Sequence, residues 1–342
     1  MASFSLAMQK PRCTTFACLS LFALRPIPYA MGESKRRKRL LEAAPCLCGS
    51  ERRAVDCCLV DGKYFRAPSK IDLWASAKAD AMARCYLRDT DRCVGPMSRE
   101  HLISAAVLRA VYVDQLVVSG FPWLPNGQTR SIGFKELTNK CLCSAHNNAL
   151  SPLDLAAGRF FTALRVADLN RSGPAFSQIV SGHDIERWML KTLFAFAHSK
   201  SLASNGSPIN PVFHPKIDPV TMLADPAAWV IGSGLSFRQP PGSLLLRSDG
   251  FGLAPFTLPG SNEIVGMTTS IQGFAFDLRA VPFDTTSPGH FRPSSIRFRH
   301  PNVVNEVTLC WSDGREHEAI DLDFAMTNAE ATARGIKIGV TP

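Results

Sequence analysis

Residues 137–154 read Leu-Thr-Asn-Lys-Cys-Leu-Cys-Ser-Ala-His-Asn-Asn-Ala-Leu-Ser-Pro-Leu-Asp, and this stretch decides the fold around it. Its first part is strand-like and carries Cys141 and Cys143, whose thiols would face the same side because they lie two residues apart. Its second part leads into a helix. Ser151 is placed to cap that helix, Pro152 to take its first position and Asp154 to complete a capping box.

Two further pieces of sequence precede this stretch. Cys85 and Cys93 come first, and Ser98-Arg-Glu-His-Leu-Ile103 follows them, ahead of an apolar run with helical spacing at residues 102–118. Cys143 and His146 then form a Cys-x-x-His pair. Such closely spaced pairs look like thiolate metal sites in a reducing compartment, and we expect the protein to be cytoplasmic.

The order of these pieces resembles the HNH, or ββα-metal, endonucleases, in which a hairpin and a helix are pinned by zinc. The resemblance implies that His101 is the general base, that Glu100 holds a catalytic metal and that Asn147 falls at the last ligand position. It also implies a structural zinc site formed by Cys85, Cys93, Cys143 and His146. Hydrolysis of a phosphodiester needs a base and a hard cation, here Mg²⁺ or Mn²⁺, which explains these residue types.

The sequence departs from the family pattern at several points. Seven residues separate Cys85 from Cys93 where two are usual, His146 stands in place of a cysteine, and Asn147 replaces the final histidine. Because His101 and Asn147 lie far apart in the sequence, a helix and a loop must be inserted between the two halves of the hairpin. A weakened site of this kind would also suit a protein that has lost cleavage.

Three assignments stay open within this region. Cys141 competes with Cys143 as a zinc ligand. Asn139 takes the place of the middle asparagine of the family motif. Asp154 supports the metal site or, equally well, acts only as the capping carboxylate of the following helix.

A second cysteine pattern lies towards the N-terminus, in Pro45-Cys-Leu-Cys-Gly-Ser-Glu-Arg-Arg-Ala-Val-Asp-Cys-Cys58. Four soft ligands so close together can surround one tetrahedral zinc ion without a core, and Gly49-Ser50 supplies the turn between the halves. The pattern resembles the SEC-C motif, a small zinc module that acts as an adaptor, although Glu51 replaces its usual second glycine. The zinc ligands would be Cys46, Cys48, Cys57 and Cys58.

The charge of the chain is concentrated in its N-terminal half. The net charge of +9 divides into +3 for residues 1–30, +5 for 31–70, +2 for 71–150 and −1 for 151–342. This asymmetry suggests a polyanionic partner, most simply DNA. An unbroken basic run is either a solvated segment or an arm that contacts phosphates, and it consists of Lys35, Arg36, Arg37, Lys38 and Arg39.

The remaining segments carry weaker signals. Residues 1–30 read as a disordered leader or an upstream-start extension, with an export or organelle-targeting signal as the alternative. The apolar stretch 16–24 is too short to cross a bilayer, so we expect no membrane partner. Helical spacing at 69–83 and 185–198 predicts two helices. Cys310 stands alone in a strand-like run and is expected to be a buried core thiol.

These signals predict an α+β protein with a small zinc module, a ββα-metal core with a helical insertion and flanking helices, and a β-rich C-terminal domain. The domains would be a leader (1–30), the basic arm and SEC-C motif (31–68), the HNH-like domain (69–200), a linker (201–219) and the β-rich domain (220–342). Neither a P-loop nor a dinucleotide fingerprint nor a nucleophile elbow occurs in the sequence.

Two functions compete at this stage. The leading hypothesis is a metal-dependent HNH-like nuclease that acts on DNA or RNA and contains two structural zinc ions. The alternative is a zinc-stabilised adaptor with a degenerate HNH site, which binds nucleic acid or, through the SEC-C module or the C-terminal domain, a protein.

Overall fold

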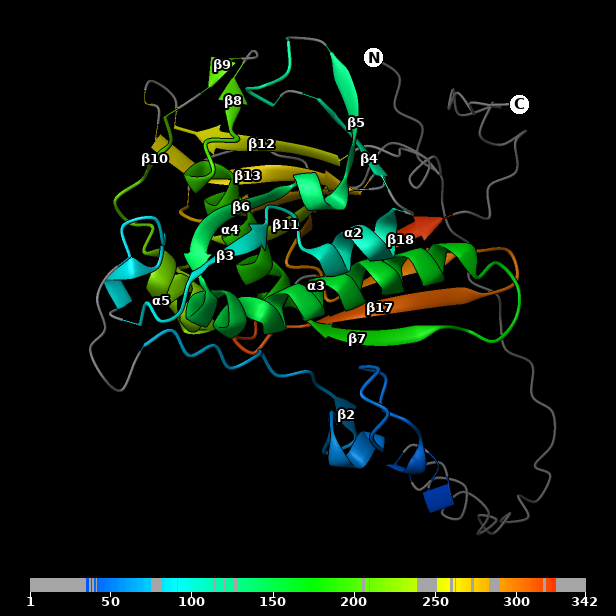
Figure 1. The fold of residues 1–342 in the computed structure, drawn as a ribbon. Helices are drawn as coiled ribbons and strands as arrows, with labels where there is room; N and C mark the ends of the chain where they lie inside the picture. The colour runs from blue at the N-terminus through cyan, green and yellow to red at the C-terminus, as the bar shows by residue number, and fades with distance from the viewer. Residues whose placement is uncertain are drawn as a thin grey trace, which may run out of the picture.

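The computed structural model describes residues 35–323, with gaps at 37, 39, 41, 75–81, 91, 113–114, 120, 126–127, 205–206, 209, 239–250, 259–260, 262, 272–273, 283–289 and 316–317. The fold is mixed α+β, as the sequence predicts, with helices packed between and beside several sheets (Figure 1). Within the described ranges, no helix is both long enough and apolar enough to cross a bilayer. The predicted leader at 1–30 lies outside the described residues.

A two-stranded hairpin and a long helix lie at the centre of the molecule (Figure 1). Strand β3 (Met97–His101) pairs antiparallel with β6 (Thr138–Cys143), so that His101 lies opposite Thr138. Helix α3 (Ser144–Leu169) follows β6 directly. The order strand, strand, helix is therefore the one that the sequence predicts for this region.

Helix α3 begins earlier than predicted, because Cys143 and not Ser151 is its N-cap. The Cys143 thiol accepts a hydrogen bond from the backbone N–H of His146 at 3.5 Å, and Pro152 lies inside the helix. A proline there cannot donate to the carbonyl one turn back, which belongs to Asn148. The Ser151 hydroxyl donates to that carbonyl instead, at 2.8 Å. Asp154 therefore has no capping role.

The segment between β3 and β6 contains both a helix and a hairpin. Helix α2 (Ala105–Val111) ends earlier than the apolar run 102–118 predicts, and β4 (Gln115–Ser119) then pairs with β5 (Thr129–Gly133). The burial of β4 alternates along the chain, as in a half-buried strand. Helix α2 packs tightly on α3, since a Cβ atom at Gly158 would lie 2.7 Å from the Cβ of Ala106.

Two larger sheets complete the body. The strand order of the first is β18-β16-β17-β7, with the bounds β7 (Ser177–Ser181), β16 (Ser295–Arg299), β17 (Val304–Cys310) and β18 (Ile320–Asp323). The order of the second is β10-β13-β14-β11-β15, with β12 paired to β13, and the bounds are β10 (Val212–Phe213), β11 (Gly234–Arg238), β12 (Phe251–Thr257), β13 (Glu263–Ile271), β14 (Phe274–Arg279) and β15 (His290–Phe291). The predicted β-rich character of the C-terminal half is confirmed.

The C-terminal strands do not fold apart from the rest of the chain. Strand β7 runs parallel to β17, with Ile179 opposite Thr308, and one hydrophobic core includes residues from Ile71 to Leu322. The predicted linker 201–219 contains β10 and the short hairpin of β8 (Ala203–Ser204) and β9 (Ser207–Pro208). The segments 69–200 and 220–342 thus share one core rather than forming two separate ones.

Helix α4 (Gly182–His198) covers the helix predicted at 185–198, and every residue from Gly182 to Ala197 is buried. The stretch from Gly182 to Ala197 nevertheless carries five ionisable side chains. Arg187 donates to Asp184 and to the carbonyl oxygens of Ser69, Leu223 and Ala224, and thereby ties two other segments to α4.

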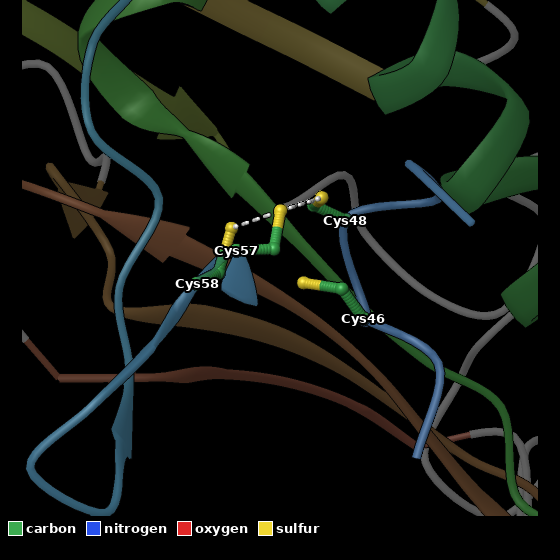
Figure 2. A group of neighbouring side chains, drawn as sticks. All are labelled: Cys46, Cys48, Cys57 and Cys58. Atoms are coloured by element: carbon green, nitrogen blue, oxygen red, sulfur yellow. Dashed lines mark hydrogen bonds between the residues drawn. The ribbon is translucent and has the colours of Figure 1, made fainter. Parts of the chain in front are cut away.

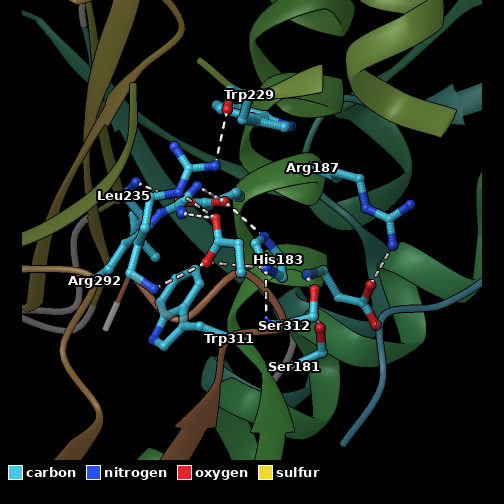
Figure 3. Close-up of polar contacts among 12 residues, drawn as sticks. Ser181, His183, Arg187, Trp229, Leu235, Arg292, Trp311 and Ser312 are labelled. Atoms are coloured by element: carbon cyan, nitrogen blue, oxygen red, sulfur yellow. Dashed lines mark hydrogen bonds and ion pairs between the residues drawn. The ribbon is translucent and has the colours of Figure 1, made fainter. Parts of the chain in front are cut away.

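A second ionic network lies on the other side of α4 from Arg187 (Figure 3). Arg292 makes two hydrogen bonds to the Glu186 carboxylate, at 2.9 and 3.1 Å, and contacts Asp313. His183 accepts from the backbone N–H of Ser312 at 3.1 Å, so its other nitrogen donates to Glu186 at 3.3 Å. These contacts fix the position and rotation of α4, which carries Lys191 one turn beyond Arg187.

The remaining elements are short. They are η1 (Ala54–Asp56), β1 (Leu59–Val60), β2 (Lys63–Tyr64), η2 (Arg88–Thr90), η3 (Phe134–Glu136), α5 (Pro219–Ala224) and η4 (Pro226–Ala228). Of the helix predicted at 69–83, residues 69–74 and 82–83 are not helical, and 75–81 lie outside the described residues.

Candidate metal centres and basic groove

The first candidate metal centre consists of Cys46, Cys48, Cys57 and Cys58, and Figure 2 shows their thiols gathered around one point. All four sulfur atoms lie within 4.8 Å of one another, with Cys48 and Cys57 at 3.5 Å and Cys57 and Cys58 at 3.6 Å. Four sulfurs at about 2.3 Å from a tetrahedral Zn²⁺ would be roughly 3.8 Å apart. The group can therefore hold a metal ion and is compatible with structural zinc.

Local backbone geometry brings these thiols together. Gly49 has a φ of +71° in the turn after Cys48, and Glu51 has a φ of 62°. Residues other than glycine rarely adopt a positive φ, so the backbone at Glu51 is in a conformation that glycine would adopt more readily. The 3₁₀ turn η1 then positions Cys57 and Cys58 opposite the first pair.

Hydrogen-bond donors surround the first centre. The Ser50 hydroxyl lies 3.2 Å from the Cys57 sulfur, Arg52 donates to the same atom at 3.2 Å, and Arg66 donates to Cys48 at 3.8 Å. Burial acts to raise the pKa of the Cys57 thiol, but hydrogen bonds from Ser50 and the neighbouring cysteines lower it to about 6. One thiolate is thus favoured even before a cation binds.

The second candidate metal centre consists of Cys85, Cys93, Cys143 and His146, all buried. The Nδ1 atom of His146 lies 3.3 Å from the Cys85 sulfur, 3.9 Å from Cys93 and 3.2 Å from Cys143. The four predicted ligands therefore converge, although they come from two loops, the end of β6 and the start of α3. Cys141 lies outside the group, which resolves its competition with Cys143.

Thr90 sets the orientation of the His146 ring. Its hydroxyl donates to the Leu87 carbonyl at 2.9 Å and lies 2.6 Å from Nε2 of His146. Since the hydroxyl proton is used on Leu87, the imidazole must donate from Nε2, which leaves the lone pair of Nδ1 for a metal. A second hydrogen bond of this kind is usual for histidines that bind zinc.

Burial of the second centre disfavours its thiolates when no cation is present. It raises the pKa of the Cys85 thiol to about 12 and also raises the pKa of Cys93, while it lowers the pKa of His146. A metal ion supplies the positive charge that thiolates need in such surroundings. The donor sets, four sulfurs in one group and three sulfurs with one nitrogen in the other, are those that zinc prefers.

We expect the purified protein to contain about two zinc ions per chain, one in each group of four ligands. Elemental analysis of protein that has been dialysed without chelator measures this ratio. A Cys46→Ser variant serves as the control, because it should lose one ion and keep the other. A ratio of about one in the wild type would remove one of the two centres.

A cluster of charged residues lies beside the hairpin, and we call Glu100, Asp154 and Lys191 the acid–lysine cluster. The Lys191 ammonium of α4 lies 2.6 Å from the Glu100 carboxylate of β3 and 2.5 Å from the Asp154 carboxylate of α3. The side chains of Glu100 and Lys191 are 4% and 3% exposed, whereas that of Asp154 is 23% exposed. Glu100 and Asp154 therefore converge as predicted, but around a lysine.

Burial and neighbouring charges act in opposite directions on the acid–lysine cluster. Burial raises the pKa of Glu100, and the Lys191 ammonium opposes this shift. Burial also acts to lower the pKa of Lys191, but Asp154 and Glu100 outweigh it and raise the pKa above its usual value. The ammonium therefore remains protonated between the two carboxyl groups.

The residues of this cluster do not fit Mg²⁺ or Mn²⁺ as they stand. Mg²⁺ binds carboxylate oxygens at about 2.0–2.1 Å and keeps several waters. A cation between Glu100 and Asp154 would have to displace the Lys191 ammonium, for which no other acceptor is found among the described residues. Breaking a buried ion pair in this way is strongly unfavourable.

His101 follows Glu100 at the end of β3, and Asn147 lies in the first turn of α3. His101 is half-buried at the end of β3, and burial followed by the charge of Arg109 lowers the pKa of its imidazole. Asn147 donates to the Ser98 hydroxyl at 2.8 Å. Asn139 lies opposite Glu100 in the hairpin.

A groove of about 460 Å³ lies between the first metal centre and helices α2 and α3, and we call it the basic groove. Arg109 of α2 and Arg159 of α3 line it, together with Cys48 and Gly49 of the metal module. A smaller cavity of about 120 Å³ adjoins it, shares Arg159 and adds Arg66. Neither Arg109 nor Arg159 has an acidic partner in the part of the chain that the structure describes.

The basic arm is described only in part. Lys35, Arg36 and Lys38 are helical and exposed, and Lys38 pairs with Glu42 at 3.9 Å. Arg37 and Arg39 lie outside the described residues. The exposure of the described members agrees with both roles that were considered for the arm.

Comparison with known proteins identifies no relative: no family model, no curated protein and no solved structure matches this chain.

Sequence reasoning missed several residues that the structure brings to these sites, among them Arg159 of the basic groove. Lys191 is a lone lysine within the apolar run Trp188–Phe196, and a charge in a buried helix is a signal that could have been used. Thr90 and Arg109 gave no such signal, because the side chains that lie beside them in the folded protein are distant in the sequence. Cys310 is buried as expected, and it packs beside Cys46, Cys48 and Cys58.

Proposed function

We propose that this chain is a zinc-stabilised protein that binds nucleic acid along the basic groove. The observation that carries the proposal is the pair of arginines, Arg109 and Arg159, which face one groove without an acidic partner among the described residues. A guanidinium group donates two parallel hydrogen bonds to a phosphate, which makes arginine the preferred residue for phosphodiester backbones. The net charge of +9 supports a polyanionic partner.

The metal centres fit this proposal as rigid walls and supports. We propose Zn²⁺ in both, because the ligand sets are closed and leave no open position for catalysis. The first centre forms one side of the basic groove through Cys48, and the second anchors the start of α3, which carries Arg159. Thiolate zinc sites suit a reducing compartment, and we therefore propose a cytoplasmic location.

We also propose that the chain contains an HNH-like domain and a SEC-C motif. Support for the HNH-like assignment comes from the hairpin β3–β6, which leads into α3 and has His101 at a strand end. Support for the SEC-C assignment comes from the four converging thiols and from the positive φ of Glu51 at the motif's second glycine position.

Loss of the two groove arginines should weaken binding by removing phosphate contacts. In an Arg109→Gln/Arg159→Gln variant, we expect the slope of log affinity against log salt to flatten by up to about 1.8 units on duplex DNA, at about 0.9 per contact. Preference among sequences should hardly change, because phosphate contacts do not read bases. Fluorescence anisotropy with labelled duplex DNA and single-stranded RNA at several salt concentrations measures both quantities.

The matched control is Arg171→Gln, which removes one exposed charge at the end of α3, away from the groove lining. Its slope should equal that of the wild type. If the double variant binds with the wild-type slope and affinity, or if the wild type binds no nucleic acid, the proposal is wrong.

A second candidate function is hydrolysis of phosphodiester bonds, and His101 favours it. Its lowered pKa keeps the imidazole neutral, the form that can accept a proton from water, and the charge of Arg109 is one cause of that shift. Incubation of supercoiled plasmid and of RNA with the zinc-loaded protein tests this candidate. Cleavage activity that co-purifies with the protein and gives nicked or shortened products would favour a nuclease. If the substrate stays intact, binding remains the proposed function.

A further inference from the structure

The acid–lysine cluster lies where the family resemblance predicts a catalytic metal. Glu100 is the residue that the resemblance assigns to the metal, and Asp154 is the carboxylate expected to support it. In the structure, these two side chains come from β3 and α3 and point towards each other. The Nζ atom of Lys191 lies between them, 2.6 Å from Glu100 and 2.5 Å from Asp154. A cation does bridge the two carboxylates, but it belongs to the protein chain.

The position of Lys191 is determined by the rest of the fold rather than by the cluster alone. Helix α4 is held by Arg187 on one side and by the Glu186–Arg292 pair on the other. Lys191 follows Arg187 by one helical turn and is buried. The helix therefore cannot withdraw the ammonium from the carboxylates without breaking these anchors.

We infer that Lys191 is a built-in cation that takes the place of the divalent metal, so that Glu100 and Asp154 join β3, α3 and α4 instead of binding Mg²⁺ or Mn²⁺. The charge of the ammonium is lower than that of a divalent ion, and its donors reach one oxygen of each carboxylate, at 2.6 and 2.5 Å. The cluster is thus a structural tie. This inference does not depend on nucleic-acid binding along the basic groove.

A variant that lacks the Lys191 ammonium should bind a divalent metal ion. Removal of the ammonium leaves two carboxylates facing a small space, which is the ligand type that hard divalent cations prefer. Lys191→Ala should therefore create a site for one Mn²⁺ per chain, with affinity at least about tenfold higher than any binding by the wild type that depends on Glu100.

Electron paramagnetic resonance of the zinc-loaded full-length protein counts bound Mn²⁺ during a titration. The wild type should show no Mn²⁺ binding that Glu100→Gln removes, Lys191→Ala should gain one site, and Lys191→Ala/Glu100→Gln should lose it again. Lys216→Ala, which removes an exposed lysine, is the control and should match the wild type. Excess zinc keeps the thiolate centres occupied, so they do not contribute to the count.

Two results would overturn the inference. One is a Mn²⁺ ion in the wild type that disappears in Glu100→Gln, because Lys191 would then leave the metal position free. The other is a folded Lys191→Ala variant that binds no more Mn²⁺ than the wild type. If Lys191→Ala does not fold, Lys191→Gln takes its place, because it keeps hydrogen-bond donors without the charge. The comparison of the wild type with Glu100→Gln still decides whether the native cluster holds a metal.

Discussion

Replacement of Cys143 by serine is expected to unfold the hairpin and the start of α3, and with them most of the core. Cys143 is fully buried, is one of the four ligands of the second metal centre and caps α3 through the backbone N–H of His146. Structural zinc contributes about 10–16 kcal/mol in small peptides, whereas whole domains are stable by only about 5–15 kcal/mol. Loss of one ligand therefore threatens the total stability.

Cys141 provides a matched control two residues away on the same strand. It is also buried, at 2% exposure, but it does not belong to the metal group. Cys141→Ser buries one hydroxyl, which costs about 1–3 kcal/mol. Thermal unfolding followed by circular dichroism, with zinc release recorded by a chromogenic chelator, should show a moderate loss for Cys141→Ser and a collapse for Cys143→Ser.

A third variant separates the two centres. Cys46→Ser should release one zinc ion and loosen only the N-terminal module, because all four of its ligands lie within one short segment. The module contacts the body through Leu47, whose carbonyl accepts from Ile179 at 3.2 Å, so the main transition should move little. Equal losses of Tm in Cys46→Ser and Cys143→Ser, or in Cys141→Ser and Cys143→Ser, would contradict this division of roles.

In any phosphodiester hydrolysis by this chain, His101→Ala is expected to lower the rate by about 10²–10⁴-fold, the usual loss when a positioned general base is removed. Zinc content and affinity for nucleic acid should remain near wild type, because His101 is neither a ligand of a metal centre nor part of the basic groove. His290→Ala, an exposed histidine on β15, is the control and should keep full activity.

The pH dependence of that rate provides a separate test. Neutral imidazole is the base, and burial together with Arg109 lowers the pKa of His101 below its usual value near 6.5. The rate should therefore persist below the usual histidine range and fall only as the pH drops through the lowered pKa. Arg109→Gln removes one cause of the shift and should move this fall to higher pH. An unchanged rate in His101→Ala would exclude His101 as the base.

The two metal centres show how far local spacing can predict a site. The ligands of the first lie within Cys46–Cys58, so chain connectivity alone keeps them close whatever the rest of the protein does. The second set is spread from Cys85 to His146, and the sequence assigned it through the resemblance to the ββα-metal endonucleases, with Cys141 left open as an alternative to Cys143. Donor chemistry restricts the choice even when distance does not.

Helix boundaries were less predictable because side chains compensate for unfavourable residues. Pro152 suggested a helix start, but the Ser151 hydroxyl satisfies the carbonyl that proline leaves free, and the metal centre holds the first turn at Ser144. The apolar run 102–118 contains both α2 and β4, and its residues suit either structure until the partner strand β5 is known. Tertiary pairing decides such cases.

By itself, the sequence predicted the mixed α+β class, the four thiols of the first metal centre, a helix at 185–198 and the strand, strand, helix order around residues 137–154. These features depend on spacing and residue chemistry within short segments. Only the tertiary structure decided that β7 joins β17 in one sheet, that Arg109 and Arg159 face one groove, and that Lys191 lies between Glu100 and Asp154. The physical reason is that a charge on a helix has no defined partner until packing brings remote segments together, and burial then makes that pairing obligatory.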